Sequence, residues 1–131
     1  MKRTTGAVLV LSMMSATAAI ADDAWMLNDS TAKVTHDCGR QPRVVINAFR
    51  DEVTLTGACS RVSVNGRSNK LVIESAAQLA VHGTDNTVDV GTVGAIVVIG
   101  AENKVSWKVA AAGKRPRVSQ NGSGNRISQT P

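Results

Sequence analysis

The sequence is poor in aromatic residues and histidines, and both shortages exclude classes of function. It contains no tyrosine, one phenylalanine and two tryptophans. Because single-stranded nucleic acid is held largely by stacking bases on aromatic rings, we expect no nucleic-acid partner. The two histidines, His36 and His82, offer little material for the convergent titratable groups of an active site. We therefore expect a non-enzymatic protein with no catalytic residue and no cofactor.

Metal-binding patterns are also scarce. His36, Asp37 and Cys38 are consecutive, and consecutive side chains of an extended chain alternate in direction, so they do not converge on one ion. Asp85 and Glu102 occupy equivalent places in two repeats, where stacking would bring their carboxylates about 5 Å apart. The chain lacks the regular aspartate series of calcium-binding nonapeptide repeats. We expect no metal site.

A long apolar run occurs only at the beginning of the chain. Lys2 and Arg3 precede an apolar stretch from Ala7 to Ile20, and Ala19-Ile20-Ala21 fits the small-residue rule for cleavage. This pattern predicts a signal peptide over 1–21 and a periplasmic or secreted protein, with no membrane span after cleavage. The remainder has the length of one domain. We expect an irregular segment at 22–34 and a β-repeat domain at 35–131.

The two cysteines, Cys38 and Cys59, form an even set in a chain expected to be exported. An oxidising compartment favours a disulfide between them. A catalytic thiol would need a histidine partner in space, and His36 is close to Cys38 only in sequence. We expect the structural disulfide.

Apolar residues recur as pairs two positions apart, which places both members of a pair on one face of a strand. β-branched residues dominate these positions and favour strands over helices. The first members of successive pairs are eight or nine residues apart, and two units make a period of 17. The pairs are Val44/Ile46, Val53/Leu55, Val62/Val64, Leu71/Ile73, Leu79/Val81, Val88/Val90, Ile96/Val98 and Val105/Trp107.

A Gly-x-x-Asn unit repeats between these runs with the same period. Glycine supplies a positive φ at a corner, and asparagine tolerates left-handed geometry and can form stacked amide ladders. The pattern predicts an all-β, two-faced solenoid of about 17 residues per coil with parallel stacking. Strands at this spacing also fit an antiparallel sandwich or barrel. The expected corner residues are Gly66, Asn69, Gly83, Asn86, Gly100, Asn103, Gly122 and Asn125.

The segments LTGACSRVSVNGRSNKLVI, VHGTDNTVDV and VIGAENKVSW carry a family resemblance. They span Val53 to Trp107, and their Gly-x-x-Asn alternation after a signal peptide resembles the small secreted bacterial family catalogued as domain of unknown function 3060. That family has no assigned activity. The resemblance therefore implies a fold and an exported location, and it transfers no catalytic residue.

Basic residues follow the repeated asparagine at three places, Lys70, Lys104 and Arg126. Lys114, Arg115 and Arg117 lie in or beside an insertion at 108–117 that interrupts the repeat and should form a loop. Outward charges commonly keep strands soluble. These six residues also form a candidate surface for an anionic polysaccharide. We expect a structural or interaction role at the cell envelope, with an envelope component or a second copy as partner, and binding of an anionic glycan as the alternative.

Overall fold

The structure is a computed structural model that describes residues 24–130, and the expected signal peptide lies outside the described residues. Every regular element in this range is a strand, so no helix there could cross a membrane. The strands are β1 (Trp25–Leu27), β2 (Lys33–Asp37), β3 (Arg43–Phe49), β4 (Glu52–Arg67), β5 (Lys70–Thr84), β6 (Thr87–Ala101), β7 (Lys104–Ala110), β8 (Arg117–Ser123) and β9 (Arg126–Gln129).

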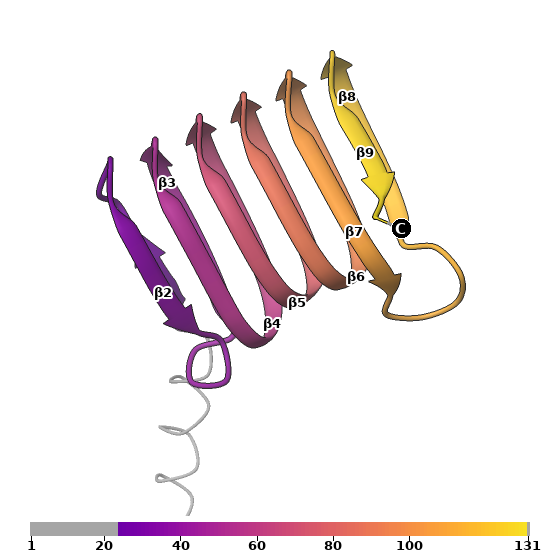
Figure 1. Cartoon of the computed structure of the whole chain (residues 1–131), viewed down its shortest axis with the longest axis horizontal. Coiled ribbons are helices and arrows are strands. Elements are labelled where there is room, and N and C mark those ends of the chain that lie inside the picture. Colours follow the sequence, from indigo (N-terminus) through magenta and orange to yellow (C-terminus); the bar gives the residue numbers. More distant parts are fainter. Residues whose placement is uncertain (1–23, 131) are drawn as a thin grey trace, which may run out of the picture.

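All strand pairs in the described chain are parallel, and each strand pairs with its equivalent in the next coil. The chain therefore forms a β-solenoid of about six coils, as the 17-residue period predicts. Figure 1 shows the coils in order from indigo to yellow, with β8 and β9 at one end. The antiparallel alternative is wrong, because consecutive segments stack one coil apart instead of pairing as hairpins.

The core consists of columns of equivalent side chains. Val64, Val81 and Val98 are aligned in register and fully buried, as expected. The columns Leu71/Val88/Val105 and Ile73/Val90/Trp107 are also confirmed. The coil is flattened and has two facing walls. The columns Leu71/Val88/Val105 and Ile73/Val90/Trp107 lie on the wall that each coil reaches first, which we call the first wall. The column Val64/Val81/Val98 lies on the facing wall, which we call the second wall.

Two expectations about the elements need correction. Successive apolar pairs, which their spacing places on separate short strands, share one long strand in each of β4, β5 and β6, because the parallel ladder continues around the bend between them. The segment 22–34, expected to be irregular, contains β1 and the start of β2. Both strands pair with later ones, so the stacked domain begins at Trp25 within the described residues.

The insertion expected at 108–117 forms a loop that is shorter than predicted, because residues 108–110 extend β7 and Arg117 begins β8. Residues 111–116 lie outside the strands and separate β7 from β8. β7 pairs with the first part of β6 and β8 pairs with its last part, so these two strands take the positions of one long strand in the preceding coil. Figure 1 shows this loop protruding beside the last coil.

Candidate functional site at the C-terminal coil

The glycines of the Gly-x-x-Asn unit have a structural role. Gly66, Gly83 and Gly100 have φ angles between 136° and 145°, a region that side chains disfavour. A Cβ added at Gly83 would lie 1.7 Å from the carbonyl oxygen of Gly66, and the same close approach recurs at the other corners. Glycine is therefore required both by the backbone conformation and by the contact between coils.

The asparagines form the amide ladder that the repeat predicts. Asn86 Oδ1 accepts hydrogen bonds from the backbone nitrogen and from Nδ2 of Asn69, at 3.2 and 3.1 Å. Asn86 Nδ2 donates to the carbonyl oxygen of Gly66 and to Oδ1 of Asn103. The same pattern continues to Asn125. These residues bond to one another and to backbone, so the inner corners are structural.

The left-handed residue of each corner is the one before the asparagine, not the asparagine itself. Ser68, Asp85 and Glu102 have φ angles of 56° to 58°. The asparagine that follows has its side chain inside the corner, where it joins the ladder. Asp85 and Glu102 therefore lie on exposed corners. Within residues 24–130, no group of three or more His, Cys, Asp or Glu side chains could hold a metal ion.

The N-terminal end of the solenoid is closed by packing. The ring of Trp25 stacks on that of His36, with centroids 4.2 Å apart. His36 is buried and its Nε2 lies 3.0 Å from the carbonyl oxygen of Gln41. The expected disulfide between Cys38 and Cys59 is present next to these residues. His82 is half-buried in an outward column between Asn65 and Ile99.

The C-terminal coil contains the excess of positive charge in the described chain. Residues 24–102 contain seven basic and eight acidic side chains, whereas residues 103–130 contain six basic side chains and no acidic one. The six are Lys104, Lys108, Lys114, Arg115, Arg117 and Arg126, all of them exposed. Within the described residues, none of them is in an ion pair. A count of charges by segment, instead of by repeat position, would have found this asymmetry in the sequence.

The predicted basic surface is divided by the structure. Lys104 and Arg126 are neighbours in one outward column, whereas Lys70 lies between Glu52 and Thr87 in the same column. Arg117 begins β8 on the second wall, and Lys114 and Arg115 lie in the loop before it. Five of the six predicted residues therefore surround the C-terminal end of the solenoid, and Lys70 lies apart from them.

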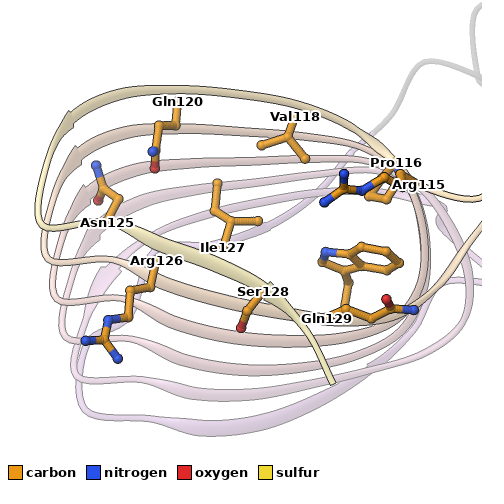
Figure 2. A pocket seen from close by; sticks show the side chains of 10 residues that line it. Arg115, Pro116, Val118, Gln120, Asn125, Arg126, Ile127, Ser128 and Gln129 are labelled. Atoms are coloured by element: carbon orange, nitrogen blue, oxygen red, sulfur yellow. The ribbon is translucent and has the colours of Figure 1, made fainter. Parts of the chain in front are cut away.

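A cavity of about 750 Å³ opens at this end of the solenoid. Figure 2 shows Val118, Gln120 and Ile127 directed into the coil and Arg126 directed away from it, with Arg115 extending over the opening. The lining contains no histidine, cysteine, aspartate or glutamate. The lining residues are Trp107, Arg115, Pro116, Val118, Gln120, Asn125, Arg126, Ile127, Ser128 and Gln129.

Two inward positions of the last coil are polar, which the repeat did not predict. Gln120 follows Val98 in the core column of the second wall, and Gln129 follows Trp107 on the first wall. Gln129 Nε2 donates to the carbonyl oxygen of Lys108 at 3.0 Å. Val118 is half exposed although its column is otherwise buried. The end of the core is therefore exposed to solvent. It presents the side-chain amides of Gln120 and Gln129 in the same cavity as the guanidinium groups of Arg115 and Arg126.

The amino-acid sequence matches the model of one known protein family. The family described as "Protein of unknown function (DUF3060)" matches residues 46–90 and 77–124. The chain belongs to the DUF3060 family. The two overlapping matches cover the stacked corners and reach Gly122 in the last coil, so the solenoid repeat and the DUF3060 pattern coincide. No curated protein and no solved structure matches the chain.

Proposed function

We propose that this DUF3060 protein is an exported, non-catalytic interaction module that binds a negatively charged component of the cell envelope through its C-terminal coil. One observation carries the proposal: six basic side chains and no acidic one lie on the last coil, and two of them line its open cavity. A surface of one sign attracts partners of the opposite sign and increases their rate of encounter.

Export is supported by the disulfide and by the first residues of the sequence. Disulfides such as Cys38–Cys59 persist in oxidising compartments. The N-terminal sequence has the charged, apolar and small-residue regions of a signal peptide. A non-catalytic role is supported by the lining of the cavity, which offers guanidinium, amide and hydroxyl groups for hydrogen bonding but contains no histidine, cysteine or carboxylate side chain, the usual general acids, bases and nucleophiles.

The proposal is tested by retention on two immobilised polyanions, polygalacturonate and polyglutamate, as the salt concentration rises. The variant Arg115→Ala/Arg117→Ala/Arg126→Ala should elute at a lower salt concentration than the wild type. The matched variant Lys33→Ala/Arg40→Ala/Arg61→Ala removes three exposed charges from the other coils and should elute with the wild type. Equal losses in the two variants, or no retention of the wild type on either polymer, would refute the proposal.

A further inference from the structure

The last coil presents an unpaired strand edge. β8 pairs with β6 and β9 pairs with β7, and neither has a second partner among the described strands. Figure 1 shows both strands at the end of the stack. Every inner coil bonds to a coil on each side. The backbone donors and acceptors on the outer edge of β8, over Arg117–Ser123, can therefore pair with an added strand.

The asparagine ladder ends at the same edge with two donors. In each inner rung, Oδ1 of one asparagine accepts from the backbone nitrogen and from Nδ2 of the preceding asparagine, as Asn125 does for Asn103. Asn125 Nδ2 donates backward to Gly100, and its backbone nitrogen has no acceptor among the described residues. By the repeat, the two nitrogens of Asn125 are aligned for one side-chain oxygen from a following coil.

The chain itself shows that a carboxylate can fill such a position. Asp51 occupies the first place in the ladder, where its Oδ1 accepts from the backbone nitrogen of Ala32. An aspartate side chain is thus compatible with the geometry of the corner. At the C-terminal end, a carboxylate bound to Asn125 would lie at the residue before Arg126. The acidic group on this corner is Glu102, whose side chain lies against Gly124.

A second copy of this chain does not meet these requirements. Stacking its N-terminal coil on the last coil in register would place Lys33 beside Arg126 and Ala32 beside Asn125. The first pair repels, and alanine offers no side-chain oxygen to the ladder. Joining two C-terminal ends would oppose two sets of six basic side chains. Charge and register therefore favour a different, acidic occupant.

We propose that the β8 edge binds an extended acidic polypeptide segment as an additional strand, with one aspartate oxygen accepting hydrogen bonds from the backbone nitrogen and Nδ2 of Asn125. The segment would pair with up to the seven residues of β8. Its inward side chain would cover Val118, which is 50% exposed. This inference rests on the proposed function and narrows the anionic partner to a polypeptide.

The test uses tryptophan fluorescence on the Trp25→Phe background, where Trp107 at the cavity is the remaining reporter. The probe is a capped nonapeptide of sequence TVDVDGTED, whose first seven residues match the length of β8 and whose last aspartate then falls opposite Asn125. It should change the emission saturably, and the affinity should fall as salt rises. The same peptide with alternate backbone nitrogens methylated keeps its charge but loses donors, and it should bind about tenfold more weakly or worse.

Two protein variants locate the contact. Asn125→Asp keeps the Oδ1 acceptor but replaces the donor Nδ2 by an oxygen, so it should weaken peptide binding about tenfold or more. Its thermal midpoint, measured by circular dichroism, reports whether the fold is retained. Lys33→Ala/Arg40→Ala removes two charges near the opposite end and should leave the affinity unchanged.

The outcomes separate this inference from the proposed function. If methylated and unmethylated peptides bind equally, or if Asn125→Asp has no effect, strand addition is refuted although anion binding stands. If polygalacturonate changes the Trp107 emission and the peptide does not, the partner is a glycan and the inference fails. If neither binds, and the Arg115→Ala/Arg117→Ala/Arg126→Ala variant only self-associates, the charges protect the edge and both proposals fail.

Discussion

The backbone nitrogen of Asp51 donates to Oδ1 of Asn69 at 3.0 Å, which makes an aspartate the first member of an otherwise all-asparagine ladder. Asp51 is buried, and its Oδ2 has no hydrogen-bond partner. In Asn69 and its successors, the second terminal atom is an amide nitrogen that donates to the coils on both sides. This position therefore contains an oxygen atom where the repeat uses a donor nitrogen.

Asp51→Asn should consequently stabilise the protein. The substitution removes a buried unpaired acceptor and supplies a nitrogen that can donate to Oδ1 of Asn69, a change of about 1–3 kcal/mol in the free energy of unfolding. Urea denaturation followed by circular dichroism measures it. Asp51→Ala is the control, because it removes the unpaired oxygen without supplying a donor. A stability equal to or below that of the wild type would show that Asp51 is favourable as it stands.

Asn86→Ala should destabilise the solenoid more than Asn125→Ala does. Asn86 accepts from Asn69 in the preceding coil and donates both to Gly66 of that same coil and to Asn103 of the next coil. Its loss therefore leaves buried backbone and side-chain groups on both sides unpaired. We expect a loss of about 3 kcal/mol or more for Asn86, and about 1–2 kcal/mol for Asn125 at the open end. The same denaturation experiment compares them. Equal losses would mean that the ladder is not cooperative along the stack.

Gly83→Ala should prevent stable stacking of the coils. The added Cβ would lie 1.7 Å from the carbonyl oxygen of Gly66, and neither backbone can move without disturbing a ladder. We expect a loss of at least about 3 kcal/mol, or no folded protein at all. Gly113→Ala is the matched control, since its Cβ meets no atom within 4 Å and only the positive φ is strained, at about 1 kcal/mol. Thermal melting distinguishes the two.

Reducing the Cys38–Cys59 disulfide should lower stability by roughly 3 kcal/mol, because the bond closes a loop of 21 residues in the unfolded chain. The readout is the urea midpoint with and without a reducing agent. The double variant Cys38→Ser/Cys59→Ser should match the reduced wild type and should not respond to the reducing agent. A midpoint that is insensitive to reduction would show that the packing of Trp25 on His36 alone holds this end together.

The interior of the fold could be predicted because stacking repeats one physical problem in every coil. Gly66, Gly83 and Gly100 meet the same carbonyl contact, and Asn69, Asn86 and Asn103 make the same hydrogen bonds. Identical residues therefore recur every 17 positions. The ends could not be predicted in this way. Each residue at an end has surroundings that occur only once in the fold, so no repeated pattern in the sequence indicates its role. These residues are Trp25, His36, Gln120 and Gln129.

The candidate site could likewise be predicted only in part from the sequence. The basic residues were visible in the sequence, but the repeat grouped Lys70 with Lys104 and Arg126 because all three follow an asparagine. Thr87 separates Lys70 from Lys104 in the column, and the neighbour of Lys70 on its other side is the acidic Glu52. Arg115 reaches the cavity because of the path that the 111–116 loop takes. That path is not part of the repeat, so the periodic pattern could not predict it.

The loop at 111–116 leaves the register of the strands on either side unchanged, since β7 and β8 align with two parts of one strand, β6. The pitch of the stack is therefore independent of what connects those two strands. Foreign sequences of quite different length, such as an epitope or an affinity tag, could be grafted there while the coils keep their spacing. The same freedom would let relatives diversify this connection without rebuilding the stack.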